Sequence, residues 1–141
     1  MTAFYEYRHV VTFRDTNLFG NVYFVNHVMW QGECREHFLR DHAPEVLGQL
    51  HEGLLLVTVS CRCDYLEELN AFDEVLVRMS LVESLQNRID LRFDYVRRAG
   101  NREVLCAVGQ QRIACMAREG EHIVPVRIPD SLERALARFS R

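Results

Sequence analysis

Residues 13–27 read FRDTNLFGNVYFVNH and lead directly into an apolar segment that continues to Arg40. The first half of this stretch is rich in Asp, Thr, Asn and Gly, which favour loops, whereas the second half takes on helical spacing. Residues 6–13 contain the aromatic and β-branched side chains that favour a strand. The sequence therefore predicts a strand, a polar loop and a buried helix in that order.

The helical spacing begins at Val22, and its apolar residues do not lie on one side only. Trp30, Cys34 and Phe38 fall outside the main stripe. A helix that is apolar on several sides is normally buried on several sides, so we expect a sheet to wrap around it and a partner subunit to cover part of it. The main stripe has three- and four-residue intervals and consists of Val25, Val28, Met29, Gly32 and Leu39.

Charged residues interrupt the predicted helix. Arg35 falls at the edge of the apolar stripe, Glu36 falls inside it, and Glu33 lies one step around. A buried guanidinium is costly unless it is paired, so Arg35 should have a carboxylate partner or a ligand. The helical pattern alone favours an internal ion pair with Glu33, Glu36 or Asp64.

The remainder of the chain is predicted to be mostly strands, because its apolar residues recur with a period of two. Residues 41–44 contain the turn residues that end the helix, and residues 45–53 form a connection with room for one helical turn. Asp130 and Ser131 can cap a terminal helix that continues through Phe139. The predicted strands cover residues 54–66, 73–85, 88–97 and 103–117, with hairpin turns at 86–87 and 99–101.

Composition limits the class of protein. The chain has 141 residues, of which 48% are hydrophobic and 26% charged, and we predict a single domain over residues 1–141. A net charge of −3 argues against a nucleic-acid-binding protein. The first residues lack the apolar core of a signal peptide, and no segment is long and apolar enough for a membrane span, so we expect a cytoplasmic protein without a membrane partner.

The five cysteines are odd in number and lie mostly within apolar strand patterns, so we expect reduced, buried thiols. Cys61 and Cys63 alternate onto one face without a second pair of ligands, which argues against a zinc site. We expect no metal and no cofactor.

Residues 13–27 resemble the signature of acyl-thioester hydrolases of the 4-hydroxybenzoyl-CoA thioesterase type, roughly aromatic-x-Asp-x-Asp-x-x-Gly-x-Val-aromatic-aromatic-x-Asn-Tyr. Residues 30–39 resemble the family's aromatic-x-x-Glu-x-Arg helix segment, and a weaker similarity continues through 64–69 and 73–77. The pattern of elements allows several α+β arrangements. The resemblance selects the hotdog fold, in which a curved antiparallel sheet wraps around one long central helix.

Asn17 departs from the family signature, which has its catalytic carboxylate at this position. An amide can donate to a carbonyl or orient a water molecule, but it cannot accept the proton. Together with Arg35, Asn17 resembles a narrower branch, the thioesterases that accompany enediyne polyketide synthases and release a polyene from its acyl carrier protein. The resemblance implies that Asn17 and Arg35 are the catalytic pair.

The chemistry of thioester hydrolysis fits these residue types. The reaction passes through a tetrahedral oxyanion that preorganised donors stabilise. The helix start near Tyr23, Phe24 and Val25 offers unpaired N–H groups and the positive end of the helix dipole. Arg35 would add a full charge at the oxyanion or at a β-keto oxygen, and Asn17 would hold the carbonyl or the water. Without a carboxylate we expect a slow enzyme.

Several candidate substrate-binding residues also have structural interpretations. His27 lies where the family often has Tyr, and it could either touch substrate or satisfy local hydrogen bonds. Glu33 is more often the partner of an arginine than a general base, and Thr58 is equally typical of a plain strand. The candidates are Tyr23, Phe24, His27, Glu33, Thr58 and Tyr65.

The resemblance also implies partners. We expect an acyl carrier protein domain of a polyketide synthase, with its phosphopantetheine-linked acyl chain, and a homodimer that pairs again into a homotetramer. The site would lie between subunits, formed by the Asn17 loop, the helix start and strands of a neighbour. Two alternatives stay open, a general acyl-CoA thioesterase and a non-catalytic protein that binds an acyl chain or polyene.

Overall fold

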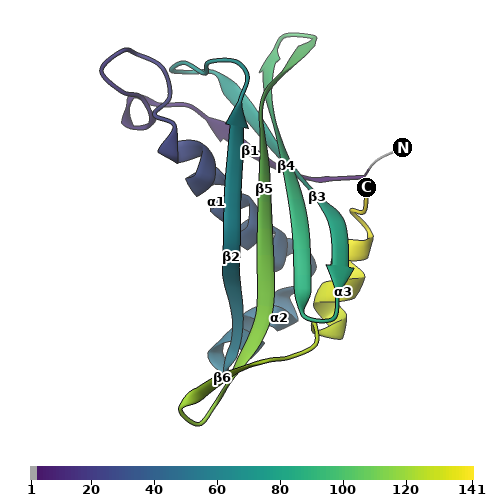
Figure 1. Cartoon of the computed structure of the whole chain (residues 1–141). Helices are drawn as coiled ribbons and strands as arrows, with labels where there is room; N and C mark the ends of the chain where they lie inside the picture. The colour runs from purple at the N-terminus through teal and green to yellow at the C-terminus, as the bar shows by residue number, and fades with distance from the viewer. Residues whose placement is uncertain (1–2) are drawn as a thin grey trace.

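The computed structural model describes residues 3–141. The chain folds into one sheet with a long helix across one of its faces and two short helices near one end (Figure 1). In chain order the elements are β1 (Tyr5–Val10), the 3-10 turn η1 (Phe13–Asp15), α1 (Val25–His42), α2 (Pro44–His51), β2 (Leu54–Tyr65), β3 (Glu74–Leu85), β4 (Arg88–Ala99), β5 (Arg102–Glu119), β6 (His122–Pro125) and α3 (Asp130–Ala137).

The sheet is antiparallel throughout, with strand order β1-β3-β4-β5-β2, and β6 pairs with the end of β5. Strands β2 and β1 form its two edges. The inward rows of β3 and β4 pack with α1 into the core, and their predicted alternation is confirmed because the residues facing inward are buried. This curled sheet around one long helix is the hotdog fold that the sequence predicts. The inward residues are Val75, Val77, Met79, Leu81, Ile89, Leu91, Phe93 and Tyr95.

Strand β2 does not alternate as the sequence predicts. Its pairing with β5 shifts register between Thr58 and Ser60, so Val59 lies in an irregularity of the ladder. A bulge of this kind moves the following side chains to the opposite face. As a result Thr58, before the bulge, and Cys61, after it, both make contacts with side chains of α1.

The first elements end and begin at different residues from those predicted. Strand β1 ends at Val10 because Thr12 and Asp15 form a capping box around η1. Helix α1 begins at Val25 rather than Val22 and continues to His42. Helix α2 has eight residues, which is longer than the predicted single turn, and α3 ends at Ala137, two residues before Phe139.

The face of α1 that the sheet buries is not the predicted main stripe. Trp30, Cys34 and Phe38 are fully buried against the sheet. The apolar strip of Val25, Val28 and Met29 is instead between 39% and 55% exposed. The helix is therefore apolar on two sides, as predicted, but the chain itself covers only one of them. None of the helices in the described part of the chain is long and apolar enough to cross a membrane.

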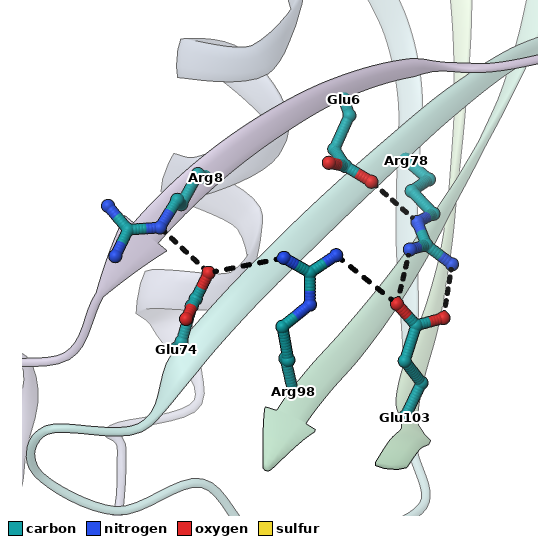
Figure 2. A network of polar contacts seen from close by, with 6 residues as sticks. All are labelled: Glu6, Arg8, Glu74, Arg78, Arg98 and Glu103. Carbon is teal, nitrogen blue, oxygen red and sulfur yellow. Dashed lines mark hydrogen bonds and ion pairs between the residues drawn. The ribbon is translucent and has the colours of Figure 1, made fainter. Parts of the chain in front are cut away.

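The opposite face of the sheet carries a network of ion pairs across β1, β3, β4 and β5 (Figure 2). Arg8 and Arg98 both approach Glu74, with N–O distances of 2.8 and 3.7 Å. Arg78 on β3 bridges Glu6 on the adjacent strand β1 and Glu103 on β5, one strand beyond β4, at 2.8 and 2.9 Å. We call these six residues the outer network: Glu6, Arg8, Glu74, Arg78, Arg98 and Glu103.

Candidate active site

Arg35 lies on α1 with its guanidinium held against the inner wall of the sheet. Its Nη1 atom donates to Thr58 Oγ1 on β2 and to Gln111 Oε1 on β5, both at 3.0 Å. Both partners are neutral. The two bonds use the two hydrogens of Nη1, so the hydrogens on Nε and Nη2 have no acceptor within residues 3–141.

The predicted ion pair of Arg35 is wrong for each of the three carboxylates considered. Glu36 points toward solvent, and Asp64 pairs with Arg62 at 3.1 Å. Glu33 accepts a hydrogen bond from the Tyr7 hydroxyl on β1 and does not bind an arginine. In the part of the chain that the structure describes, no carboxylate approaches Arg35 within ion-pair distance, and its charge is left for a group from outside.

Burial lowers the pKa of Arg35 from its ordinary value, while Glu36 and the thiol of Cys61 act in the opposite direction. A guanidinium nevertheless stays charged in proteins, so the side chain is a partly buried cation between neutral neighbours. Such a group loses hydration without a compensating charge. A carbonyl, enolate or oxyanion of a ligand would supply the missing acceptor for Nε and Nη2.

The start of α1 is open toward ligands. Phe24 is the N-cap residue, no side chain caps the helix, and its first turn has no acidic residue. The N–H groups of Phe24 and Val25 have no backbone acceptor among the described residues, whereas the Tyr23 N–H donates to the Asp15 carbonyl at 2.9 Å. The expectation of a free N–H is therefore wrong for Tyr23. At the other two positions the orphan donors and the positive helix end remain available.

Three of the predicted substrate-binding residues lie together beside this helix start. The Tyr65 hydroxyl donates to the Phe24 carbonyl at 2.8 Å, and the rings of Tyr65 and His27 are 4.7 Å apart. A cavity opens beside them. Tyr23 packs on Phe24 but does not line this cavity. The cavity has a volume of about 270 Å³ and is lined by Asn21, Val22, Phe24, His27, Tyr65, Leu66, Glu67, Glu68 and Leu69.

His27 forms the buried floor of this cluster, with 4% of its surface exposed. Burial lowers the pKa of His27 to about 4, although the backbone of Phe24 acts in the opposite direction. The ring is therefore neutral at pH 7 and packs against Trp30 and Tyr95. Its Nδ1 atom is buried and has no hydrogen-bond partner in the described chain.

Asn17 lies in the loop between η1 and α1. Its Oδ1 atom accepts the N–H of Phe19 at 2.8 Å, which leaves the Nδ2 hydrogens as donors. Asp15, at the first Asp of the signature, has a structural role. Burial raises its pKa, but the N–H of Thr12 and the ring of His9 outweigh burial, and the pKa is lowered.

One chain does not bring Asn17 and Arg35 together. Arg35 follows the first residue of α1 by ten positions, which corresponds to about 15 Å along the helix axis. The Asn17 loop precedes the N-terminal end of α1 (Figure 1), so the length of helix from Val25 to Arg35 separates the loop from Arg35. Thr58 accompanies Arg35, and the remaining substrate-binding candidates cluster near the helix start, except Glu33.

Sequence reasoning missed two glutamines at this site. Gln31 is 0% exposed and Gln111 is 6% exposed, and they contact each other between α1 and β5. The signal that could have found Gln111 is its place in the inward-facing row of β5, with Gly109, Ile113 and Cys115. A polar side chain in an apolar row is the informative exception.

The curved antiparallel sheet around one long helix is the fold of the hotdog acyl-thioester hydrolases. The family model of the thioesterase-like superfamily matches residues 11–136, and the chain belongs to that superfamily. The chain is 53% identical to a dynemicin thioesterase over 98% of both chains, with a TM-score of 0.94. The crystal structures of that enzyme reveal induced-fit and allosteric effects upon polyene binding.

More distant structures confirm the fold. A variant of 4-hydroxybenzoyl-CoA thioesterase complexed with 4-hydroxybenzoyl-CoA is 16% identical over 93% of this chain and 96% of that one, with a TM-score of 0.82. The 1,4-dihydroxy-2-naphthoyl-CoA thioesterase of Synechocystis is 20% identical over 96% of both chains, with a TM-score of 0.80. No curated protein sequence matches the chain. The predicted resemblance is confirmed, and the protein is a thioester hydrolase.

Proposed function

We propose that this thioesterase hydrolyses a polyene β-keto acyl thioester from the acyl carrier protein of an enediyne polyketide synthase. The observation that carries the proposal is the guanidinium of Arg35, which among residues 3–141 has only neutral partners and two nitrogens without acceptors. A β-keto thioester offers two carbonyl oxygens to such a fork. The 53% identity to the dynemicin thioesterase supports the polyene as the acyl chain.

The reaction needs a water molecule, a thioester and stabilisation of one oxyanion. Water attacks the thioester carbon, the tetrahedral oxyanion collapses, and the phosphopantetheine thiolate leaves and takes up a proton. Arg35 stabilises the oxyanion or the β-keto oxygen through Nε and Nη2, and the N–H groups of Phe24 and Val25 supply further donors. Asn17 holds the carbonyl or the water through Nδ2 and does not accept the proton.

We infer that the working site needs two copies of the chain, because one chain keeps Asn17 and Arg35 apart. The exposed strip of Val25, Val28 and Met29 on α1 is apolar, and the edge strand β2 exposes Val57 and Val59. Uncovered apolar strips and open edges are typical of surfaces that pair with a second copy. The Asn17 loop and helix start of one protomer would meet Arg35 and the inner face of the sheet of the other protomer. Two such dimers would form the tetramer.

The substrate class is tested by thiol release from a panel of thioesters. The panel contains a β-keto polyene and a saturated acyl chain, each on coenzyme A and on a carrier protein. We expect the carrier-bound β-keto chain to react at least tenfold faster than either CoA ester. Faster hydrolysis of simple CoA esters would favour a general acyl-CoA thioesterase, and no hydrolysis of any ester would favour a binding protein.

Two variants at one position test the loop in the same assay. Asn17→Ala removes the Nδ2 donor and should lower kcat by about 10² to 10³-fold, as the loss of one oxyanion donor does elsewhere. Asn17→Asp restores the carboxylate of the family signature and should raise activity on simple acyl-CoA esters. Unchanged rates in both variants would remove Asn17 from the mechanism. Light scattering on the same samples should show a dimer or tetramer, and a monomer would overturn the two-chain site.

A further inference from the structure

Two buried side-chain amides stand behind Arg35 in a continuous chain of hydrogen bonds. Gln31 Nε2 donates to the Arg62 carbonyl on β2 at 3.1 Å. Gln111 Nε2 donates to Gln31 Oε1 at 3.0 Å, and Arg35 Nη1 donates to Gln111 Oε1 at 3.0 Å. The thiol of Cys61 also donates to Gln31 Oε1, at 3.2 Å. The carbonyl oxygen and the amide nitrogen of both glutamine side chains therefore have a hydrogen-bond partner.

The direction of each amide is determined by the backbone carbonyl at the far end. Because Gln31 Nε2 is bound to the carbonyl of Arg62, Gln31 must present its oxygen toward β5. That oxygen can only accept, so Gln111 must turn its nitrogen toward Gln31 and its oxygen toward Arg35. The reverse orientation of either amide would leave a buried donor facing a donor, which is costly.

A neutral acceptor at this position has a different effect from a carboxylate. A carboxylate would form an ion pair with the guanidinium and satisfy its charge. Gln111 instead binds Nη1 and leaves the charge uncompensated, with Nε and Nη2 directed elsewhere. The amide thus orients the guanidinium without neutralising it.

Gly109 makes room for this arrangement. A Cβ atom placed on Gly109 would lie 2.2 Å from Gln31 Nε2, which no side chain could tolerate without moving the glutamine. Gly109 has an ordinary strand backbone, so its conformation does not require glycine. The close approach of Gln31 is the feature that does.

We propose that Gln111, oriented by Gln31, is a positioning residue that aims the Arg35 guanidinium at the substrate and keeps its charge available. This inference rests on the proposed role of Arg35 in thioester hydrolysis. It adds a second layer to the site, composed of groups that touch Arg35 and not the substrate.

The decisive variant is Gln111→Glu, which changes one atom and makes the side chain titratable. Above its pKa the carboxylate pairs with Arg35 and cannot donate to Gln31, so kcat should fall at least tenfold at pH 7.5. The protonated form has one O–H and one carbonyl, as the amide has one N–H toward Gln31 and one carbonyl toward Arg35. The guanidinium beside it favours the ionised form, so the ratio of its kcat to that of the original enzyme at the same pH should be lowest near neutral pH and rise as the pH falls toward the usual carboxyl pKa of about 4.3 and below it.

A merely structural glutamine would not produce this inverted pH profile. Gln111→Met, which keeps the volume and removes both hydrogen bonds, should lower kcat about tenfold at every pH with little change in KM. The matched controls are Gln110→Glu and Gln110→Met, at the neighbouring exposed position of β5. Gly109→Ala displaces Gln31 from behind and should also lower kcat. It provides the test if the Gln111 variants fold poorly.

Arg35→Ala, assayed alongside, separates this inference from the proposed function. If Arg35→Ala is inactive and the Gln111 and Gly109 variants keep the original kcat and pH profile, the positioning role is wrong and the role of Arg35 stands. If Arg35→Ala keeps full activity, both are wrong. Loss of activity in Arg35→Ala with a low-pH recovery confined to Gln111→Glu supports both.

Discussion

The same residue type serves opposite purposes on the two faces of the sheet. In the outer network, Arg8, Arg78 and Arg98 meet an equal number of glutamates, and the charges cancel within the chain (Figure 2). On the inner face Arg35 donates to two neutral groups, Thr58 and Gln111. All seventeen basic residues of the sequence are arginines, so residue identity alone does not distinguish the two roles. The identity of the partners does.

The two arrangements also differ in their effect on stability. Ion pairs on an exposed surface contribute little, typically below about 1 kcal/mol each. Arg78 is the exception in the outer network, because its side chain is 18% exposed, contacts two glutamates and lies 4.7 Å from the ring centroid of Phe4. Arg35 loses hydration without gaining an anion, which lowers stability. Protein stability is commonly reduced in this way where a site needs an available charge.

The largest expected difference comes from replacing Arg35 and Arg78 with methionine. Arg35→Met removes the oxyanion donor and should lower kcat/KM by about 10² to 10³-fold, with the free energy of unfolding unchanged or slightly higher. Arg78→Met should leave kcat/KM within about twofold and lower the free energy of unfolding by about 1–2 kcal/mol, because two glutamates lose their partner. Thiol-release kinetics and urea unfolding measure the two quantities.

The opposite assignment would appear as a stability loss in Arg35→Met that equals or exceeds the loss in Arg78→Met. Arg35 would then be a packing residue, and its activity loss would follow from unfolding. Near-UV circular dichroism of both variants at the assay temperature serves as the control, since it reports whether the tertiary packing is intact.

The next largest effect is on the pH dependence of the free energy of unfolding, which differs between groups on the two faces of the sheet. The pKa of His27 is lowered to about 4 by burial, against about 6.5 in the unfolded chain, so only the unfolded state binds the proton between these values. The free energy of unfolding should therefore fall as the pH decreases, by about 2 kcal/mol between pH 6.5 and 4.5. Urea unfolding across this range tests the slope.

The carboxyls with lowered pKa act in a different window. Glu103 in the outer network, together with Asp15 and Asp41, has a pKa below its usual value, so its stabilising contribution is present above about pH 4.5 and is lost below it. His27→Phe should consequently flatten the curve between pH 6.5 and 4.5 and leave the decline below pH 4.5. His122→Gln, at an exposed position of the β5–β6 hairpin, is the control, and an unchanged slope in His27→Phe would contradict the assignment.

The sequence predicts the elements better than the contacts between them. The long helix and the four long strands follow from apolar periodicity, and the loop signature identifies the superfamily. The bulge at Val59 was not predicted, because both faces of β2 contain apolar and polar residues on either side of it. The sequence predicts a carboxylate partner for Arg35 on the helix or at Asp64, whereas the observed partners are neutral. Thr58 and Gln111 come from strands 23 and 76 residues away in sequence.

The candidate site was predicted only in part for the same reason. Local signals identified Asn17 and the helix start, which lie within one continuous segment. The place of Gln111 depends on the register of β5 against β2, where it pairs with Cys61, and register is a long-range property. The separation of Asn17 from Arg35 along α1 also became apparent only in the fold, because both belong to segments that are close in sequence.

The smallest expected effect concerns Arg8, the outermost member of the outer network. Its side chain is 62% exposed, and Glu74 keeps Arg98 as a second partner when Arg8 is removed. Arg8→Met should therefore lower the free energy of unfolding by less than about 0.5 kcal/mol at low salt, and 1 M NaCl should remove the difference because it screens exposed charges. Urea unfolding at both salt concentrations measures this, with thiol release expected to be unchanged. A loss above about 1 kcal/mol, or a change in kcat, would show that the outer network is coupled to the inner face, and the contrast between paired and unpaired arginines would no longer separate structure from function.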